Sequence, residues 1–487
     1  MIRTLGFMGL LLLSATAFAA DPDTDRIIQE ALKPSPLESN LRRLTDEIGG
    51  RVPGTPAMER AIEWGMASFR AAGGANIHTE DFSLEASWAE GATEMTVAGE
   101  RVSFRPRVVS IAWAPALAPV KHVEIVDVGY GRPEELAKAG DVTGKMLFVH
   151  SDVLKTWDDL FEEYMRPLPV IDFAVKNRAT AIALVATREH DIMYRLTNSG
   201  RGEIDRIPMV LMAREDALRI ARLIAGGEKV YADLSIPNKI GGPIKSSNVI
   251  AEIPGSEKPD EFVVLGAHLD SWELGTGALD NGCNAALVVD ALRAIQSSGL
   301  KPKRTIRFIL FSGEEQGLVG SRAYTVAHQA ELDNAAGVVI FDSGTGRTTS
   351  FSTGGRTDVM PALAPLIGAF DQFGGVKLAP TGEAGTDHLD FLFEGVPTFV
   401  ADQQEANYLV NYHAVSDTYD KVDVAQLKKH VAEAAAMTLF LANLPQHVGP
   451  RLDRTQIEQT MHDAHLDDEL KAMGMWSDWA NGKRGRK

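Results

Sequence analysis

The sequence predicts an α/β protein whose mixed, mainly parallel sheet is flanked by helices and carries a second, inserted α/β segment. From about residue 247 onward, short apolar runs alternate with stretches of helical periodicity, which is typical of parallel strands joined by helices. Residues 112–236 contain a separate series of short strands and helical patches. The stretch 237–247 is rich in Gly, Pro and Ser and predicts a linker back to the main sheet.

The N-terminus has the pattern of a secretory signal peptide. Arg3 is the only charged residue among the first twenty, and an apolar stretch runs from about Leu5 to Phe18. Ala17-Phe18-Ala19 fits the small-x-small cleavage rule. A membrane anchor is the alternative, but the stretch is shorter than the ~20 residues of a spanning helix. We therefore expect export to the periplasm or the exterior, with no membrane span after cleavage.

These patterns divide the chain into five expected segments. They are a signal peptide (1–20), the N-terminal part of the main domain (21–111), the insert (112–240), the larger part of the main domain (241–446) and a polar C-terminal tail (447–487).

Composition narrows the possible functions. The formal net charge of −17 argues against nucleic acid as a partner, and the basic residues 483–487 are interpreted as a solvated chain end. Cys283 is the only cysteine, so an internal disulfide is excluded.

Polar residues follow three consecutive predicted strands of the main domain. His268 comes directly after the apolar run 261–265, Glu314-Glu315 follow the strand 305–311, and Asp342 follows the strand 338–341. Ligands of open α/β sheets bind at the carboxyl ends of the strands, so these side chains converge if the strands are parallel.

Two loops complete this group with Asp280 and His413. Two imidazoles and three or four carboxylates are the ligands that two zinc-like ions require when they share one carboxylate. The sequence therefore predicts a site for two Zn²⁺ ions per chain. Surface residues and helix-capping acids are the alternative reading of each motif taken alone.

The motifs together resemble those of the M28 family of co-catalytic zinc exopeptidases, and within it the carboxypeptidase Q branch. The resemblance covers about residues 37–444 and rests on five motifs. They are Gly-Ala-His-Leu-Asp-Ser-Trp at 266–272, Lys-Pro-Lys-Arg-Thr at 301–305, Glu-Glu-Gln-Gly at 314–317, Gly-Thr-Asp at 385–387 and Ser-Asp-Thr at 416–418. The middle segment resembles the protease-associated-like insert of that branch.

The resemblance implies a role for each residue. Asp280 matches the bridging carboxylate, with His268 and Asp342 completing one metal site and Glu315 and His413 the other. Glu314 matches the general base, and Asp270 matches the acid that orients His268. The resemblance also implies a cis peptide at Asp280–Asn281 and a homodimer.

Two departures from the branch concern the expected substrate contacts. Ala384 is an extra residue between Glu383 and the Gly-Thr-Asp motif that ends at Asp387. Tyr412 stands where relatives often have a second His before His413. We take Glu383, Asp387, Tyr408 and Tyr412 as candidate substrate contacts, and simple packing is the alternative for the two tyrosines.

The expected function is that of an exported di-zinc exopeptidase. It would hydrolyse dipeptides or remove terminal residues from short peptides, using metal-activated water and Glu314 as the base. The choice between amino- and carboxy-terminal residues stays open. A glutaminyl-cyclase-like aminoacyl transferase with one zinc and a non-catalytic binding ectodomain are the alternatives. The complete set of five ligands argues against both.

Overall fold

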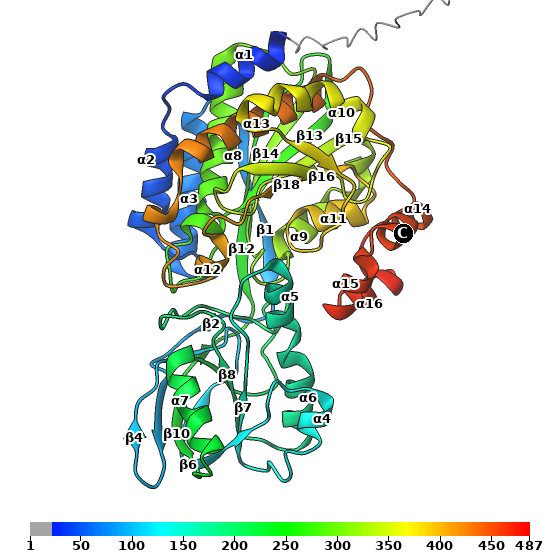
Figure 1. The fold of residues 1–487 in the computed structure, drawn as a ribbon. Helices are drawn as coiled ribbons and strands as arrows, with labels where there is room; N and C mark the ends of the chain where they lie inside the picture. Colours follow the sequence, from blue (N-terminus) through cyan, green and yellow to red (C-terminus); the bar gives the residue numbers. More distant parts are fainter. Residues whose placement is uncertain (1–21) are drawn as a thin grey trace, which may run out of the picture.

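A computed structural model describes residues 22–487, and its described residues form two eight-stranded sheets, one above the other in Figure 1. The expected signal peptide of residues 1–20 lies outside the described residues. The larger sheet contains, in spatial order, β1 (Ala75–Leu84), β12 (Ile244–Ile253), β14 (Arg304–Phe311), β13 (Lys258–His268), β15 (Ala335–Ile340), β18 (Thr398–Gln403), β16 (Thr348–Ser352) and β17 (Lys377–Ala379).

Parallel pairing dominates the centre of this sheet. β14, β13, β15 and β18 are parallel neighbours, whereas β1 and β12 are antiparallel at one edge and β16 is antiparallel to β18 near the other. The predicted fold class, a mixed and mainly parallel sheet flanked by helices, is confirmed.

The central strands are buried on both faces, and this explains their continuous apolar sequences. In β13, Val263 and Leu265 enter one core cluster while Phe262 and Val264 enter the other, because successive side chains point to opposite faces. The helices of the main domain cover these two faces (Figure 1). The first face is covered by α1 (Pro22–Ala31), α2 (Leu37–Arg42), α3 (Pro56–Ala71), α8 (Cys283–Ser298), α10 (Met360–Ile367) and α13 (Val424–Asn443), and the second by α9 (Val319–Ala327) and α11 (His388–Phe393).

The second sheet is built largely from the middle of the chain. Its strands in spatial order are β4 (Ser103–Phe104), β3 (Glu94–Ala98), β10 (Tyr231–Ile236), β6 (Leu117–Asp127), β7 (Met146–Val149), β8 (Ala181–Val185), β9 (Met209–Met212) and β5 (Val108–Ser110). Its helices are α4 (Pro133–Leu136), α5 (Trp157–Met165), α6 (Pro167–Lys176) and α7 (Arg214–Ala225).

This sheet begins before the expected boundary at residue 112. β3 pairs with β10 and β5 pairs with β9, each across about a hundred residues of chain or more. Both strands are short, with β5 at one edge of the sheet and β3 next to the edge strand β4, and the local sequence carries no sign of a partner so far away. The segment 94–110 therefore belongs to the second sheet rather than to the main domain.

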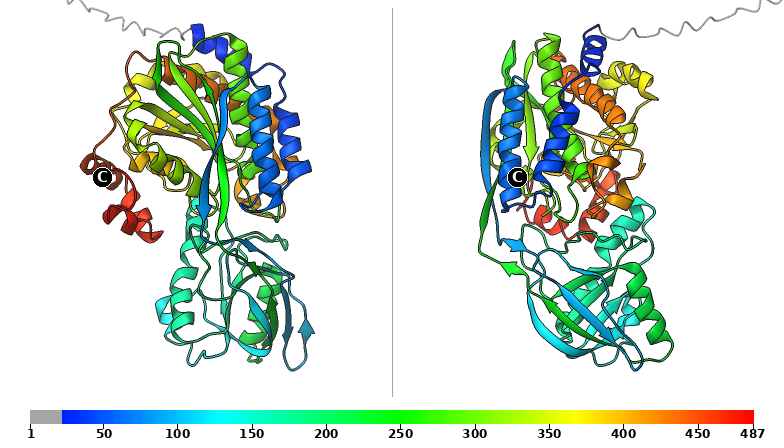
Figure 2. Two further views of the ribbon diagram at one scale, coloured as in Figure 1. Left: turned by 180° about the vertical axis from the view of Figure 1, so that it is seen from behind. Right: turned by 90° about the vertical axis from the view of Figure 1, so that its left-hand side faces the viewer.

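The second sheet is inserted between two neighbouring strands of the larger sheet. β1 leads out and β12 leads back, and they pair antiparallel as far as Leu84 and Ile244 (Figure 2, left). The two-stranded ribbon of β2 (Trp88–Ala89) and β11 (Lys239–Ile240) follows directly. The second sheet therefore occupies the position of a loop between adjacent strands.

The polar C-terminal segment of residues 447–487 is folded onto the main domain. They form α14 (Arg454–Asp463), α15 (Leu466–Ala472) and α16 (Trp476–Ala480), which lie beside α11 (Figures 1 and 2). Trp479 is fully buried and stacks on Phe393 at 5.5 Å. Arg484, expected in a solvated end, is buried and donates to both carboxylate oxygens of Asp390 at 2.7 Å. A few well-spaced apolar residues are thus enough to pack this polar segment against the main domain.

Candidate metal centre

The candidate site lies where three parallel strands end. His268 is the last residue of β13, Glu314 and Glu315 follow β14, and Asp342 follows β15. Because β13 lies between β14 and β15 in the sheet, the three strand ends are adjacent.

Two further elements bring in the remaining ligand candidates. Asp280 lies in the turn Ala278–Gly282 that precedes α8, and the Asp280–Asn281 peptide is cis, so this prediction is confirmed. His413 lies in the loop after α12 (Tyr408–Asn411). The structure thus brings together all five residues that we predicted as metal ligands.

Asp280 lies between the two imidazoles and points one oxygen at each. Its Oδ1 is 3.2 Å from His268 Nε2, and its Oδ2 is 3.2 Å from His413 Nε2. Asp342 Oδ1 is 3.0 Å from His268 Nε2, and Glu315 Oε2 is 2.8 Å from His413 Nε2. The cluster therefore has two halves, each with one imidazole and one carboxylate of its own, joined by Asp280.

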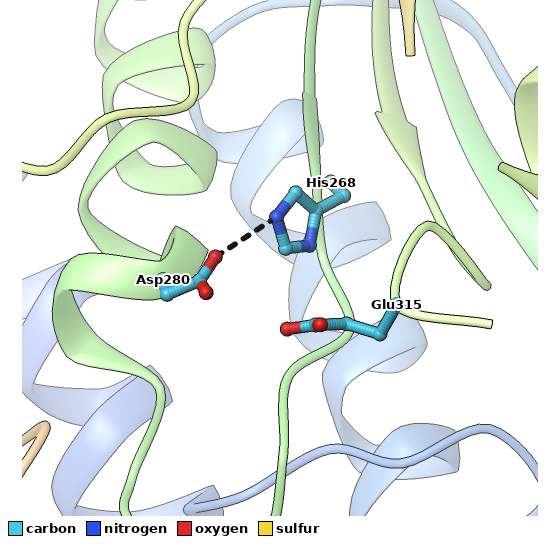
Figure 3. Close-up of side chains that lie close together, drawn as sticks. All are labelled: His268, Asp280 and Glu315. Carbon is cyan, nitrogen blue, oxygen red and sulfur yellow. Dashed lines mark ion pairs between the residues drawn. The ribbon is translucent and has the colours of Figure 1, made fainter. Parts of the chain in front are cut away.

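The unpaired atoms of the cluster fit a bound cation. Asp280 Oδ2 and Glu315 Oε1 are buried and have no hydrogen-bond partner in the described part of the chain. His268, Asp280 and Glu315 each offer a ligand atom, and these atoms all lie within 4.8 Å of one another (Figure 3). Buried carboxylates without partners are costly unless a positive charge compensates them. Imidazole nitrogen and carboxylate oxygen are also the atoms that Zn²⁺ accepts.

Both imidazoles are held in the tautomer that metal binding needs. His268 Nδ1 faces the backbone oxygen of Asp270 at 3.0 Å, and His413 Nδ1 faces that of Arg195 at 3.2 Å. A carbonyl oxygen can only accept, so Nδ1 carries a proton in each ring, and Nε2, which faces the cluster, is the atom that would bind a metal ion.

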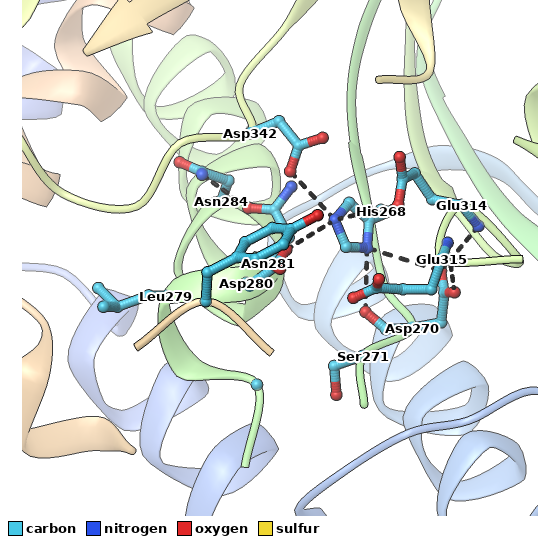
Figure 4. Close-up of polar contacts among 12 residues, drawn as sticks. His268, Asp270, Ser271, Leu279, Asp280, Asn281, Asn284, Glu314, Glu315 and Asp342 are labelled. Carbon is cyan, nitrogen blue, oxygen red and sulfur yellow. Dashed lines mark hydrogen bonds and ion pairs between the residues drawn. The ribbon is translucent and has the colours of Figure 1, made fainter. Parts of the chain in front are cut away.

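Asp270 contacts the site differently from the expectation. Its carbonyl, rather than its carboxylate, makes the shorter contact with His268 Nδ1, since Oδ1 is 3.6 Å away. The carboxylate instead accepts from the backbone N–H groups of Glu314 and Glu315, both at 3.3 Å (Figure 4). Asp270 thus fixes the turn that carries both glutamates as well as one imidazole.

Negative charge accumulates in the cluster and shifts its pKa values. Burial raises the pKa of Glu314 well above its usual range, and the neighbouring Asp342 and Glu315 raise it further. Burial and Asp280 raise the pKa of Glu315 to about 7, although His413 opposes this shift. A cation would relieve this repulsion and restore both carboxylates to their charged form.

The four candidate substrate contacts occupy different surroundings. The Tyr408 hydroxyl donates to the backbone oxygen of Asp342 at 3.3 Å, so Tyr408 borders the cluster. Tyr412 instead stacks on the His413 ring at 3.7 Å. Asp387 is fully buried, and burial followed by the charges of Asp342 and Asp270 raises its pKa to about 8.

Glu383 belongs to a second acidic pair. Its carboxyl lies against Asp402, and burial followed by the charge of Asp402 raises the pKa of Glu383 to about 8. Of the four candidates, Tyr408 and Tyr412 contact predicted ligand residues, Tyr408 through the backbone of Asp342 and Tyr412 through the ring of His413.

Two buried residues that sequence reasoning did not single out shape the loops of the site. Arg51 donates to the carbonyls of Leu269 and Gly277 at 2.7 and 2.9 Å, and so ties the two loops together. Asp417 accepts from the N–H groups of Leu279 and Asp280 at 2.7 and 3.2 Å. Asp417 lies in one of the five motifs, whereas Arg51 gave no signal beyond its place in a turn-rich loop.

Comparisons with known proteins show what the chain is similar to. The profile described as "Peptidase family M28" matches residues 248–438, which contain all five ligand candidates. Mouse carboxypeptidase Q is 26% identical over 406 residues, covering 83% of this chain and 85% of that protein.

Solved structures agree as well. The peptidase M28 precursor of Shewanella amazonensis SB2B superposes with a TM-score of 0.79 at 26% identity, over 88% of this chain and 98% of that one. BSAP, a zinc aminopeptidase from Bacillus subtilis, shares the fold with a TM-score of 0.62 at 20% identity, over 82% of this chain and 93% of that one. The resemblance drawn from the motifs is therefore confirmed: residues 248–438 match the peptidase family M28 model, and the similarity to carboxypeptidase and aminopeptidase relatives shows that the protein is a metallo-exopeptidase.

Proposed function

We propose that this protein is an exported exopeptidase that holds two Zn²⁺ ions and hydrolyses dipeptides or the terminal residues of short peptides. The observation that carries the proposal is the position of Asp280, which points one carboxylate oxygen at each of two oriented imidazoles. His268 and Asp342 would hold one ion, and His413 and Glu315 the other, with Asp280 shared. The names of the relatives, a carboxypeptidase and an aminopeptidase, support peptide substrates but leave the end of the peptide open.

Ions bound here would supply Lewis acidity, which polarises a carbonyl and lowers the pKa of water. The protein's own part in proton transfer falls to Glu314. Its Oε2 is 4.0 Å from His268 Nε2, and its side chain is 14% exposed, more than those of His268, Asp280 and Glu315. Glu314 can therefore reach the solvent-facing side of the cluster, accept a proton from the attacking water and return it to the leaving amine.

The decisive experiment compares wild type with Glu314→Ala. We expect two metal ions per chain in both proteins, measured by elemental analysis. Hydrolysis of a dipeptide panel should fall about 10²–10⁴-fold in the variant, because general acid–base catalysis contributes a factor of this size. Comparable dipeptide hydrolysis by both proteins would show that Glu314 is not the general base. Aminoacyl transfer with one bound metal would favour the cyclase alternative.

Export and self-association are further parts of the proposal. No helix of residues 22–487 is both long and apolar enough to cross a membrane. Export rests on the signal-peptide pattern, so the mature protein should begin at Ala20 or Asp21, which intact-mass analysis of the secreted chain tests. The homodimer rests on the resemblance alone, and sedimentation equilibrium tests it.

A further inference from the structure

Residues of the insert contact the loop of the metal centre that carries His413. The backbone N–H of Arg195 donates to the carbonyl of His413 at 2.9 Å, and that of Val415 donates to the carbonyl of Met193 at 2.9 Å. Tyr194 and Ala414 form the bridge between these two bonds. A short stretch of the insert is thus paired with the loop that carries one ligand candidate.

The insert also contacts the His413 ring itself. Nδ1 lies 3.2 Å from the carbonyl oxygen of Arg195 and 3.4 Å from the hydroxyl oxygen of Tyr164, a residue of α5. The Tyr164 hydroxyl lies 3.1 Å from that of Tyr412, whose ring stacks on His413. Insert residues therefore surround the side of the imidazole opposite Asp280 and Glu315.

A buried ion pair supports this contact from behind. Arg188 and Glu163 both belong to the insert, are 2.6 Å apart and are almost fully buried. Arg188 also donates to the carbonyl of Tyr412 at 3.2 Å. Because Glu163 precedes Tyr164 in α5, the pair ties the helix that carries Tyr164 to the loop that carries His413.

The backbone of His413 needs such support. Its φ of +58° lies in the left-handed region, which residues with a side chain seldom adopt. Such conformations persist where the surroundings over-determine them. Here three insert residues, Arg195, Arg188 and Tyr164, bind the backbone or the side chains of Tyr412 and His413.

The His268 ring is instead oriented by the main domain. His268 Nδ1 faces the carbonyl of Asp270, two residues further along the same segment of the main domain. The two imidazoles are thus oriented by different parts of the molecule.

We infer that the insert is a built-in part of one metal position: Tyr164 and the Arg195 carbonyl orient His413, so the position held by His413 and Glu315 depends on the insert. The position held by His268 and Asp342 does not. Tyr164 is a positioning residue, since it acts through His413. This inference rests on the proposed two-metal function.

The test is Tyr164→Phe, which removes one hydroxyl and keeps the ring. Chelator competition with the Zn²⁺-loaded protein should resolve two affinities in wild type. In the variant we expect one affinity to fall about tenfold to 100-fold, the usual effect of losing a partner of a ligating residue, while the other is unchanged. Titration of the metal-free protein with Co²⁺ should show the same selective loss in its visible absorption bands.

Tyr324→Phe is the matched control. Tyr324 is a buried tyrosine of the main domain, and its hydroxyl accepts from Arg307 at 2.9 Å. The substitution removes the same atom far from His413, so both metal affinities should equal those of wild type. Tyr412→Phe removes the hydroxyl that faces Tyr164 and should weaken the same position as Tyr164→Phe. If circular dichroism shows that Tyr164→Phe is poorly folded, the metal affinities of Tyr412→Phe provide the test instead.

Two outcomes would overturn the inference: no change in either affinity, or an equal fall in both, in Tyr164→Phe. Wild type that binds a single ion would instead contradict the proposed two-metal function. The inference is then judged on that one affinity, and an unchanged value in Tyr164→Phe would contradict it too.

Discussion

At the scale of single residues, the carboxylates of the metal centre differ in which imidazole they contact. Asp280 contacts both imidazoles, whereas Asp342 contacts only that of His268 and Glu315 only that of His413. Chemically similar acids should therefore have different effects when they are removed.

We expect Asp280→Ala to abolish binding of both ions, because each half of the centre loses its shared ligand. Asp342→Ala should leave about one ion per chain, since His413, Glu315 and Asp280 are intact. Elemental analysis after gel filtration measures both. Equal metal contents in the two variants would show that Asp280 is not the shared ligand.

Most ligand residues of this centre could be predicted from the sequence, because parallel strands place their carboxyl ends at one edge of the sheet. His268, Glu315 and Asp342 needed only that rule and the strand pattern. The partners of the ligands were not accessible in this way. Tyr164 and Arg195 lie more than two hundred residues from His413, and nothing in their neighbourhood marks them as its contacts.

At the scale of elements, α13 combines a long apolar surface with buried titratable groups. His430 is fully buried between the side-chain amides of Gln403 and Gln426, at 2.9 and 3.1 Å. Burial lowers the pKa of His430 from 6.5 to about 4; a backbone hydrogen bond with Gly346 and the charge of Asp423 oppose this shift, and the charge of Lys429 adds to it. The unfolded chain therefore binds a proton between these pH values and the folded chain does not.

The sign of the linkage follows from this difference. The stability associated with His430 is present above pH 6.5 and is lost as the pH falls toward 4. Between pH 7.5 and pH 5 this group alone should cost about 2 kcal/mol of unfolding free energy. His430→Gln should therefore show a smaller loss over this range than wild type. Urea unfolding at the two pH values measures it.

His462→Gln is the control for this comparison. The His462 side chain is 72% exposed, so its replacement should leave the pH dependence of unfolding as it is in wild type. A loss in His430→Gln as large as that of wild type would assign the acid sensitivity to other groups.

The C-terminal helices show why element boundaries are harder to predict than element types. The sequence of 447–487 is polar, and three short helices are held by a few contacts, of which the Trp479 ring is the largest. Ala464 and Leu466 also lie against Gly382, at the start of the loop that carries Glu383 and Asp387.

Trp479→Ala should cost about 3–5 kcal/mol, the usual effect of deleting a large buried aromatic side chain. If the helices support the 382–387 loop, KM for dipeptides should rise as well, while both metal ions stay bound. Thermal unfolding and steady-state kinetics measure the two effects. Trp476→Ala, in the same helix but only partly buried, should cost less.

At the scale of the whole molecule, metal binding should contribute to stability as well as to chemistry. A ligand that binds only the folded state stabilises it by mass action, about 4 kcal/mol at a thousand times its dissociation constant. Removing the ions with a chelator should therefore lower the thermal midpoint of wild type and of Glu314→Ala alike. Asp280→Ala should show a low midpoint that added Zn²⁺ does not raise. Scanning calorimetry provides the comparison.

The centre of the larger sheet followed from local sequence because its central strands are buried on both faces and read as continuous apolar runs. The extent of the second sheet did not, because β3 and β5 find their partners only after the chain has returned. Long-range pairing of such short strands has no counterpart in the local pattern.

The paired strands β1 and β12 have a consequence for how such a chain can change over evolution. Their ends lie side by side, so a segment inserted between them closes with little loss of chain entropy, and its length can vary without shifting the register of the larger sheet. Topology alone would make this segment a replaceable module. The contacts at His413 restrict that freedom, because any replacement would have to present an acceptor to the same ring nitrogen.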